Sequence, residues 1–443
     1  MRKKIGIFLI CMLLIFSTTS LALTTFSRDE LNTKLSVFNT SPIHLSNSNV
    51  WMKTFDKTIF DFGNSAQQTN DGGYIIIGFT ISLVTNDSDI WLVKIDTYGN
   101  KVWDKTFGGA DFDIGSSVQQ TDDGGYIITG STNSSDGDWS DTWLIKTNSD
   151  GIEVWNRTYG ETNEEYGYSV KQTADEGYII IGSTSSPYEP YGISIGDFWL
   201  IKTNSNGLEE WNKTFGGKND DVGTSVQQTN DGGYIITGST ESFGAGREDV
   251  WFVKTDTNGN KVWDKTFGGI DDDMGYSVQQ TIDGGYIITG FTYSFGIDLS
   301  DVWLIKTDSN GVEMWNKTFG GIDDDMGYSV QQTDDGGYII TGETSSLSDT
   351  DTYVYLVKTD GDGNKMWDET FGGPGVSCGM SVQQTSDDGY IIGGFAGSYD
   401  IDFLLIKTDS QGKSKTLSLG YLWFEKLLNR FPMFEKILNQ ILL

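Results

Sequence analysis

Apolar residues along most of this chain stand in short runs that alternate with polar turn sequences, a pattern of β-strands rather than of long helices. In one representative stretch, Asp283-Gly-Gly and Asp308-Ser-Asn-Gly311 are tight-turn sequences. The runs around these turns are rich in aromatic and β-branched residues, which favour strands. The four runs are Ser277-Val-Gln-Gln-Thr281, Tyr286-Ile-Ile-Thr-Gly290, Asp301-Val-Trp-Leu-Ile-Lys306 and Val312-Glu-Met-Trp-Asn-Lys-Thr-Phe319. We therefore expect a unit of four short antiparallel strands.

This unit recurs along the chain at an almost constant spacing. Each copy carries a Gly-Tyr step, and successive tyrosines are 52 residues apart, except for one interval of 56. The seven tyrosines are Tyr74, Tyr126, Tyr178, Tyr234, Tyr286, Tyr338 and Tyr390. Four antiparallel strands in about 50 residues are typical of a β-propeller blade. The missing helical period and the Gly-rich composition exclude a helical solenoid.

The two ends of the repeat array complement each other. Val50-Trp-Met-Lys-Thr-Phe55 has the pattern of a fourth strand but stands before the first complete copy. The last copy reaches Phe403-Leu-Leu-Ile-Lys-Thr408, and no fourth-strand tryptophan follows it. Pairing these segments would remove an exposed sheet edge. We expect an all-β fold, a seven-bladed β-propeller with four-stranded antiparallel blades over residues 50–411, closed by the N-terminal strand. An open superhelical array is the alternative.

Two kinds of residue recur at fixed strand positions, and the scaffold accounts for both. Large tryptophan rings in the third and fourth strands are expected to hold adjacent blades together. The fourth-strand tryptophans are Trp103, Trp155, Trp211, Trp263, Trp315 and Trp367. The third strand carries a lysine in every copy, at Lys94, Lys146, Lys202, Lys254, Lys306, Lys358 and Lys407. We expect each lysine to pair with an acid of its own blade, whereas an anion-binding lysine ring is the alternative.

Composition narrows the classes of function. The 443 residues include 62 acidic and 30 basic ones, and the net charge of −32 repels polyphosphate and argues against nucleic acid as a partner. The single histidine, His44, excludes histidine-rich zinc sites and argues against His-based catalytic triads. Of the 2 cysteines, Cys11 falls in a predicted leader, so Cys378 has no partner for an intrachain disulfide. We interpret Cys378 as a buried packing residue.

The two ends of the chain differ from the repeats. Basic residues, an apolar run and Ser20-Leu-Ala22 predict a signal peptide over residues 1–22, with a membrane anchor as the alternative. The Ser-, Thr- and Asn-rich composition of residues 23–49 predicts a flexible linker. Residues 412–443 predict an amphipathic helical tail, broken at Pro432. This tail packs on the propeller or, alternatively, contacts a membrane or envelope surface or mediates self-association.

One copy carries the motifs of a known kind of propeller. Asp249-Val-Trp-Phe-Val-Lys-Thr-Asp256, Gly259-Asn-Lys-Val-Trp263 and Phe267-Gly-Gly269 resemble the β-propeller repeats of secreted microbial proteins. The resemblance covers residues 50–409 and implies an extracellular, usually non-enzymatic scaffold, without catalytic residues to transfer. The blades are also similar, more weakly, to those of quinoprotein-type propellers. The interval from Asp256 to Trp263 is shorter than in their docking motif, so we infer no quinone cofactor.

Length differences between copies point to one face of the propeller. Only the loop between the second and third strands changes length, and it emerges on the same face as the acidic blade-to-blade connections. Variable loops on a rigid scaffold commonly bind partners. The candidate ligand-binding residues are Tyr188 and Tyr191 in the longest loop, and Asp221, Asp273 and Asp325 in the connections. The tyrosines suit stacking on a sugar ring, or alternatively rigidify their loop.

The acids of the connections have three interpretations. An acid stands two residues before a glycine in six copies, at Asp61, Asp113, Glu165, Asp221, Asp273 and Asp325. Such an acid commonly forms a hydrogen-bonded turn. Alternatively, clustered carboxylates bind Ca²⁺, and the candidate metal ligands are Asp113, Asp221, Asp273 and Asp325. Catalysis by paired acids is the third interpretation.

The function expected from the sequence is that of a secreted or cell-surface scaffold. It binds a protein or glycan partner through its acidic variable-loop face and is non-catalytic. One alternative is an extracellular propeller enzyme, carbohydrate-active or quinone-dependent, with carboxylates near the axis. Another is a structural component of the cell envelope, held by the C-terminal helices. The fifth and sixth copies share Gly-Ile-Asp-Asp-Asp-Met-Gly-Tyr-Ser-Val-Gln-Gln-Thr, and this near identity favours the scaffold.

Overall fold

The computed structural model describes residues 50–133, 139–160, 164–188, 193–348 and 350–414. The chain divides into two compact units, Met1–Ser48 and Asn49–Leu443, and all the described residues belong to the second. In the described ranges the secondary structure consists of strands β1 to β28, and no helix there is long and apolar enough to cross a membrane. The predicted signal peptide and linker, and the C-terminal tail beyond residue 414, lie outside these ranges.

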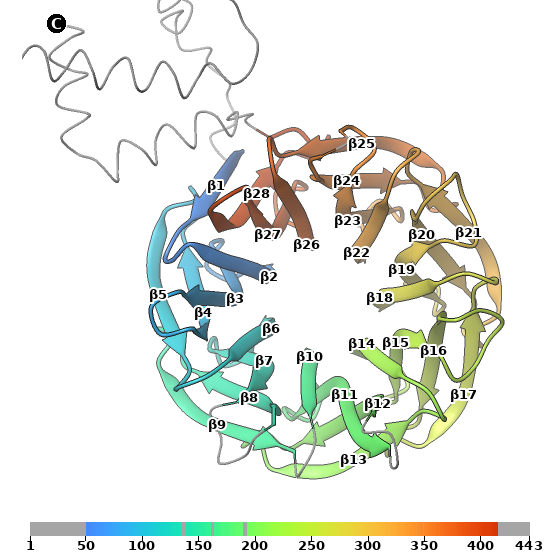
Figure 1. Ribbon diagram of the computed structural model, residues 1–443, viewed down its shortest axis with the longest axis horizontal. Coiled ribbons are helices and arrows are strands. Elements are labelled where there is room, and N and C mark those ends of the chain that lie inside the picture. Colours follow the sequence, from blue (N-terminus) through green and yellow to red (C-terminus); the bar gives the residue numbers. More distant parts are fainter. Residues whose placement is uncertain (1–49, 134–138, 161–163, 189–192, 349, 415–443) are drawn as a thin grey trace, which may run out of the picture. The chain divides into compact units, whose positions relative to one another are not determined.

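The strands form repeated antiparallel sheets around a common centre, as Figure 1 shows. The strands nearest the centre are β2 (Phe60–Gln68), β6 (Asp113–Gln120), β10 (Glu165–Gln172), β14 (Asp221–Gln228), β18 (Asp273–Gln280), β22 (Asp325–Gln332) and β26 (Val376–Gln384). The second strands are β3 (Tyr74–Ser82), β7 (Tyr126–Thr132), β11 (Tyr178–Tyr188), β15 (Tyr234–Thr240), β19 (Tyr286–Thr292), β23 (Tyr338–Thr344) and β27 (Tyr390–Gly397).

The remaining strands lie farther from the centre. The third strands are β4 (Asp87–Ile95), β8 (Asp141–Thr147), β12 (Ile193–Thr203), β16 (Asp249–Thr255), β20 (Asp301–Thr307), β24 (Tyr353–Thr359) and β28 (Ile401–Thr408). The outermost strands are β1 (Trp51–Phe55), β5 (Lys101–Phe107), β9 (Glu153–Tyr159), β13 (Glu209–Phe215), β17 (Lys261–Phe267), β21 (Glu313–Phe319) and β25 (Lys365–Phe371). The prediction of an all-β fold built from repeated four-stranded antiparallel sheets is confirmed.

The strands from β6 to β25 form separate four-stranded sheets in sequence order. The remaining strands form one eight-stranded sheet, in which β26-β27-β28 continues into β2-β3-β4-β5 and β1 pairs with β28. The link between β28 and β2 is a single parallel bridge, Phe60 with Ile401. By contrast, β1 runs antiparallel to β28 in a continuous register from Trp51 opposite Lys407 to Phe55 opposite Phe403. The first strand of the described chain therefore pairs with the last strand of the last repeat.

A repeated glycine sets the close approach of the first and second strands. In the fifth copy, a Cβ atom added to Gly290 would lie 1.7 Å from the carbonyl oxygen of Met274, so only glycine fits there. The same strand pair contains a register shift between Gly275 and Ser277. Such a β-bulge leaves one extra residue in the strand and changes the direction of its side chain. The Gly of each Tyr-Ile-Ile-x-Gly run thus belongs to the geometry of the bulge.

Hydrogen bonds between neighbouring sheets follow a complete cycle. The last glutamine of each innermost strand accepts a backbone N–H from the turn of the preceding sheet. These glutamines are Gln120, Gln172, Gln228, Gln280, Gln332, Gln384 and Gln68. The cycle returns to its start where Ser386 N donates to Gln68 Oε1 at 2.9 Å. The innermost strands of the last and first copies, β26 and β2, also contact each other directly.

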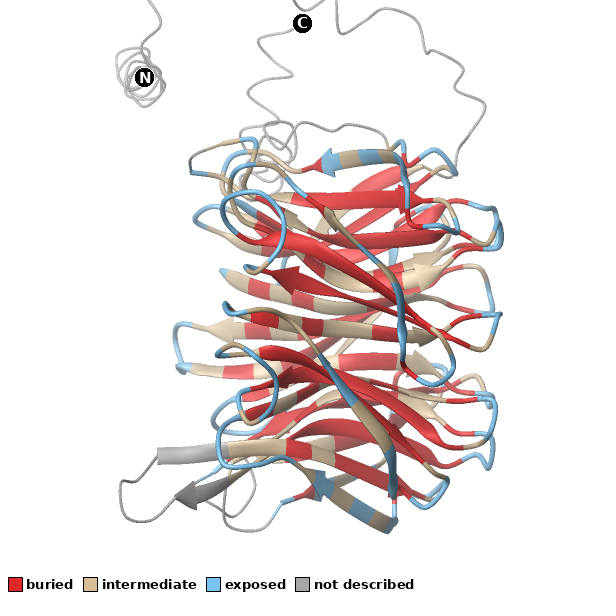
Figure 2. Ribbon diagram, turned by 90° about the vertical axis from the view of Figure 1, so that its right-hand side faces the viewer, coloured by how far each residue is buried: buried red, intermediate tan, exposed pale blue. Residues whose placement is uncertain are grey.

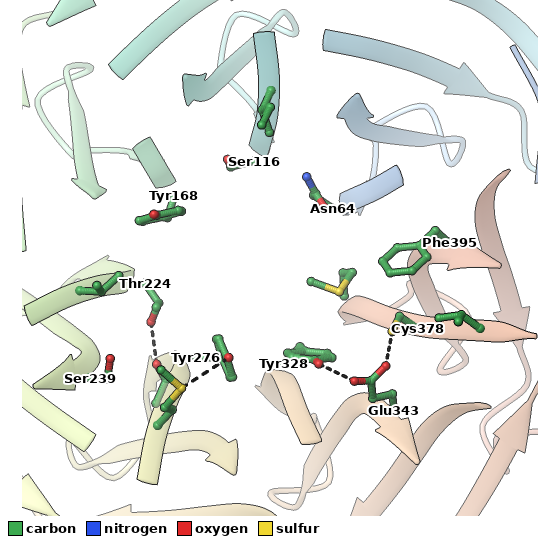
Figure 3. A pocket seen from close by; sticks show the side chains of 16 residues that line it. Asn64, Ser116, Tyr168, Thr224, Ser239, Tyr276, Tyr328, Glu343, Cys378 and Phe395 are labelled. Carbon is green, nitrogen blue, oxygen red and sulfur yellow. Dashed lines mark hydrogen bonds between the residues drawn. The ribbon is translucent and has the colours of Figure 1, made fainter. Parts of the chain in front are cut away.

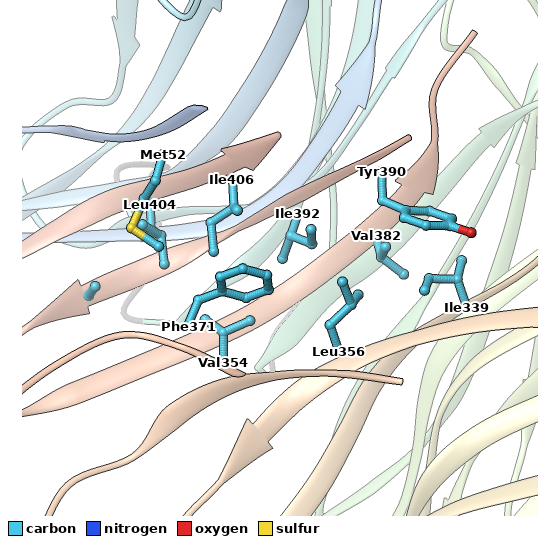
Figure 4. Close-up of a cluster of buried hydrophobic side chains, with 11 residues drawn as sticks. Met52, Ile339, Val354, Leu356, Phe371, Val382, Tyr390, Ile392, Leu404 and Ile406 are labelled. Atoms are coloured by element: carbon cyan, nitrogen blue, oxygen red, sulfur yellow. The ribbon is translucent and has the colours of Figure 1, made fainter. Parts of the chain in front are cut away.

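Aromatic pairs repeat the same cycle farther from the centre. The outermost-strand tryptophan of one sheet packs on the repeat tyrosine of the next. Trp51 of β1 makes this contact with Tyr74, with ring centroids 5.5 Å apart. Hydrophobic clusters fill the spaces between sheets, and Figure 4 shows one to which Met52 of β1 and Leu404 of β28 both contribute. Figure 2 shows that the buried residues follow the strands, whereas the loops are largely exposed. The predicted core role of the tryptophans is confirmed.

The third-strand lysines pair with acids of their own repeats, as predicted. Each ammonium group lies 2.9–3.0 Å from the aspartate of the turn that precedes the repeat tyrosine. The aspartates are Asp71, Asp123, Asp175, Asp231, Asp283, Asp335 and Asp387. The lysine side chains are buried, whereas the aspartates are largely exposed. Because every one of these lysines has an acidic partner, they form no free anion-binding ring.

Candidate functional site

A pocket lies where the seven innermost strands face one another (Figure 3), and we call it the axial pocket. Its volume is about 780 Å³, which lies in the range of small-molecule sites. The lining residues are Asn64, Ile114, Ser116, Tyr168, Val222, Thr224, Ser239, Met274, Gly275, Tyr276, Tyr328, Glu343, Val376, Cys378, Met380 and Phe395. They come from all seven innermost strands and from β15, β23 and β27.

The β-bulges supply most of the variable lining. Every innermost strand has its register shift at the same place, between the glycine and the serine of the Gly-x-Ser sequence. The extra residue x is Asn64, Ser116, Tyr168, Thr224, Tyr276, Tyr328 and Met380 in the successive copies, and all of these line the axial pocket. A bulge redirects one side chain without changing the scaffold. The pocket therefore differs in chemistry around its circumference although the backbone repeats.

The axial pocket lies toward the end of the ring that carries the variable loops. Its lining residues come from the early part of each innermost strand, such as Asn64 in β2. They also come from the last residues of second strands, such as Ser239 in β15 and Glu343 in β23. The loops between second and third strands begin just beyond these positions. The pocket and the loops that differ in length therefore share one end of the ring.

One carboxylate stands among the lining side chains. Tyr328 Oη donates a hydrogen bond to Glu343 Oε1 at 2.8 Å, and the Cys378 thiol donates to Glu343 Oε2 (Figure 3). These residues come from β22, β23 and β26, so the contact joins the sixth and seventh repeats. Both carboxylate oxygens are thus oriented by neutral donors. A carboxylate has about four lone-pair positions, so it retains acceptor capacity toward the pocket.

The cysteine in this cluster is a donor rather than a nucleophile. Cys378 is only 4% exposed. Burial raises the pKa of its thiol well above the usual range, and the negative charge of Glu343 raises it further. Because the thiolate is the reactive form, a thiol that stays protonated at neutral pH has low nucleophilicity. The sequence-based interpretation of Cys378 as a buried residue is confirmed, and its hydrogen bond to Glu343 adds a role that the sequence did not predict.

Aromatic and thioether groups make up much of the wall. Tyr276 and Tyr328 meet edge to face, with ring centroids 5.2 Å apart and an interplanar angle of 69°. Burial raises the pKa of the Tyr276 hydroxyl to about 12, and that of Tyr328 rises for the same reason and because Glu343 lies beside it. Both hydroxyls therefore remain neutral at physiological pH. The result is a largely apolar wall with a single carboxylate.

The acids predicted as ligands are structural elements of the connections. Asp113, Asp221, Asp273 and Asp325 are the first residues of innermost strands rather than loop residues, and each is 0% exposed. Each accepts the backbone N–H of a glycine at the preceding connection, at 2.7–2.8 Å. The interpretation as hydrogen-bonded turn acids therefore matches their contacts. Their predicted roles in binding a partner or Ca²⁺ stay predictions.

Further acids lie beside these buried carboxylates. Burial raises the pKa of Asp197 in β12, and the negative charge of Asp221 raises it further. Elsewhere, Asp56, Asp400 and Asp402 place carboxylate oxygens within 4.8 Å of one another, where β1 ends and β28 begins. None of these three was among the predicted metal ligands. The two predicted loop tyrosines are not described: the side chain of Tyr188 and the whole of Tyr191 lie outside the described part of the chain.

Fold and pocket together define the class: the protein is a β-propeller. No model of a known protein family matches the chain, and no curated protein matches it either. Among solved structures, the WD40 domain of Neurospora crassa Pan2 matches with 8% identity and a TM-score of 0.49, covering 85% of this chain and 94% of that one. Sqt1 from Chaetomium thermophilum matches with 10% identity and a TM-score of 0.46, covering 84% and 86%.

Another similar structure is a polysaccharide lyase of the ulvan lyase family PL25, with 11% identity and a TM-score of 0.47. It covers 81% of this chain and 97% of that one. Likenesses at these identities concern the fold alone. They transfer no ligand, activity or partner to this protein.

Proposed function

We propose that the chain forms a seven-bladed propeller in which β1 is the outermost strand of the seventh blade. The tryptophan of β1 supports this count, since Trp51 packs on Tyr74 as Trp103 packs on Tyr126. The cycle of glutamine hydrogen bonds, which returns from Ser386 to Gln68, supports it as well. The motifs around Asp249 and Gly259 further support membership of the kind of propeller repeat found in secreted microbial proteins.

We propose that this propeller is a secreted or cell-surface binding scaffold without catalytic activity, and that it holds a protein or glycan partner at its variable-loop end. The observation that carries this proposal is the axial pocket. Its seven bulge positions differ in chemistry while the surrounding scaffold repeats. A group of the partner inserts into the pocket, and the loops contact the rest of the partner. The predicted leader supports export.

The contents of the pocket favour binding over catalysis. Glycoside cleavage by the usual route uses two carboxyl groups about 5–10 Å apart. The lining residues supply one carboxyl group, that of Glu343. The thiol beside it is held protonated, as its raised pKa indicates. A carbohydrate-active enzyme with its site in this pocket would therefore lack the second acid of that mechanism.

A ligand screen with two matched variants tests the site. Thermal stabilisation is measured for the wild type against a library of glycans and small molecules. A ligand whose free concentration is ten times its Kd stabilises the native state by about 1.4 kcal/mol, and it should raise Tm by about 2 °C. Ser116→Trp fills the axial pocket from a half-buried bulge position, and Ala245→Trp places the same ring on an exposed loop of the same end.

The proposal predicts that ligands stabilise the wild type and Ala245→Trp but not Ser116→Trp. If ligands still stabilise Ser116→Trp but no longer stabilise Ala245→Trp, the binding site lies on the loop surface and not in the pocket. A wild type stabilised by nothing in the library would contradict the binding function itself.

A further inference from the structure

We propose that the ligand group held in the axial pocket is an organic cation, an ammonium group on an apolar body, and that Glu343 is its counter-ion. This inference rests on the proposed function, because it specifies the chemistry of the same pocket. It follows from the charge of the lining, from the differences between the repeats, and from the aromatic wall.

The charge of the lining is unbalanced. Among the 16 residues that line the pocket, Glu343 is the only acid, and none is Lys, Arg or His. Its two hydrogen-bond donors, Tyr328 and Cys378, are neutral. No ion pair of Glu343 occurs among the described residues. Glu343 is half-buried, and a partly desolvated carboxylate is stabilised by an opposite charge. A cationic ligand would supply that charge.

The scaffold itself does not need an acid at position 343. The same position of the second strand carries Phe79, Ser131, Ser183, Ser239, Phe291 and Phe395 in the other copies. Likewise, the innermost-strand position of Cys378 carries apolar or aromatic residues in the other copies, namely Phe62, Ile114, Tyr166, Val222, Met274 and Met326. The exceptional acid and the exceptional thiol therefore occur in adjacent repeats and contact each other. This coincidence is explained by a shared ligand and not by folding.

The wall around the carboxylate suits a cation with an apolar body. Tyr276, Tyr328 and Phe395 line the same pocket as Glu343, and Figure 3 shows the rings of Tyr276 and Tyr328 beside one another. Aromatic faces attract ammonium groups within about 6 Å of the ring centroid, and sites for quaternary ammonium use this effect. The thioethers of Met274 and Met380 adapt to irregular apolar shapes. A neutral sugar would use few of these groups.

The charge of the whole chain acts in the same direction. A net charge of −32 raises the local concentration of cations and lowers that of anions. One lysine lies on an innermost strand, Lys171 of β10, and it stands three residues beyond the lining residue Tyr168. It is not part of the lining. Anionic ligands would therefore meet repulsion without a compensating contact in the pocket.

Matched ligands separate charge from shape. Binding of tetramethylammonium, choline and benzyltrimethylammonium is measured by isothermal titration and by thermal shift, with sodium chloride at equal concentration as the salt control. The neutral carbon isostere of choline, 3,3-dimethylbutan-1-ol, has the same shape without the charge. We expect at least one of the cations to bind, and choline to bind at least about tenfold more tightly than its isostere.

Two Glu→Gln variants test whether the preference for a cation arises in the axial pocket. Glu343→Gln keeps the size and the acceptor for Tyr328, and it should fold, since other copies tolerate Ser or Phe at this position. We expect it to weaken cation binding at least about tenfold. Glu313→Gln removes an exposed acid from the outermost strand β21, away from the pocket and the variable loops, and should leave the affinity unchanged.

The outcomes distinguish this inference from the function on which it rests. Equal binding of choline and its isostere, or equal cation affinity of the wild type and Glu343→Gln, would overturn the cationic class while leaving a binding pocket. If none of the three cations binds, but neutral ligands of the library bind the wild type and not Ser116→Trp, the cationic class alone would be overturned. If neither the cations nor any library ligand binds the wild type, the inference and the binding function would be overturned together.

Discussion

Replacement of Trp51 by Ala should lower the free energy of unfolding by about 3–5 kcal/mol, the usual cost of removing a large buried aromatic side chain. Trp51 is 6% exposed, although it stands at the first strand of the described chain. Its ring meets Tyr74 edge to face, and its Nε1 donates to the carbonyl of Thr97 at 3.2 Å. These contacts lie on the first repeat, whereas its strand pairs with the last. The residue therefore joins the two ends of the array.

Trp103→Ala is the matched control, because Trp103 makes the corresponding contact inside the array. Its ring lies 6.0 Å from Tyr126, and it covers the turn at Gly151 as Trp51 covers the turn at Gly99. Urea unfolding followed by circular dichroism should give losses for the two variants that agree within about 1 kcal/mol. A loss below about 1 kcal/mol for Trp51→Ala, with a full loss for Trp103→Ala, would mean that β1 is frayed in solution.

Asp335→Asn should also cost several kcal/mol, although the altered side chain is largely exposed. The reason is its partner, Lys358, which is 3% exposed and whose ammonium lies 2.9 Å from Asp335 Oδ2. The substitution removes the negative charge and leaves a buried ammonium with only neutral acceptors, namely the amide oxygen of the new side chain and the carbonyl of Thr359. Breaking a buried pair by removing one partner costs about 3–5 kcal/mol, and we expect the lower end because Asp335 reaches solvent.

A neighbouring aspartate provides the control for this prediction. Asp334 stands in the same turn, is exposed, and has no ion pair among the described residues. Asp334→Asn should change stability by less than about 0.5 kcal/mol. Adding Lys358→Met to Asp335→Asn should recover stability, since the buried charge is then gone. Equal losses for Asp334→Asn and Asp335→Asn would show that the lysine pair does not stabilise the fold.

The same pairs predict the response to acid. Burial alone would raise the pKa of Asp335, but hydrogen bonds from Thr333 and Lys358 lower it below its usual value. The corresponding groups in other repeats, such as Asp231, have a pKa of about 2. A depressed folded-state pKa stabilises the protein above the unfolded value, near 4, and this stability is lost as the pH falls toward 2. The Asp335→Asn variant should lose less stability than the wild type over this window.

Sequence reasoning succeeded where a residue is repeated because the scaffold needs it. The Gly-Tyr spacing predicted the repeated four-stranded sheets. The recurrence of the third-strand lysine predicted an acid partner in the same repeat, and for Lys306 that partner is Asp283. Periodicity reports such positions directly, because every copy faces the same packing problem. The contact of Trp51 with Tyr74 follows the same rule at the end of the array.

The pocket could not be predicted in this way, because its residues are those that do not repeat. The β-bulge directs Tyr276 and its counterparts into the pocket, and bulges are set by backbone geometry that no short motif specifies. A column-by-column comparison of the seven copies does contain a signal, since Glu343 and Cys378 are exceptional at their positions. We instead predicted the binding site from the differences in loop length between the copies. Asp273 and its counterparts are buried residues at the start of innermost strands, and their carboxylates accept hydrogen bonds from the preceding connections.

A disulfide between the first and last strands tests the closure of the ring most directly. Thr54 and Leu404 are Cα partners in the antiparallel pair of β1 and β28. Antiparallel partners lie about 4.5–5.5 Å apart, which a disulfide bridges without strain. The double variant Thr54→Cys/Leu404→Cys is made with Cys11 and Cys378 replaced by Ser. The register control, Thr54→Cys/Ile406→Cys, moves one cysteine two residues along β28, to a separation of about 7–8 Å.

Mild oxidation of the folded protein, followed by intact-mass and non-reducing gel analysis, reports the result. The account predicts an intramolecular disulfide in nearly all molecules of the first variant and little in the control. Free thiols in the first variant, or faster closure in the control, would contradict the pairing of β1 with the last repeat.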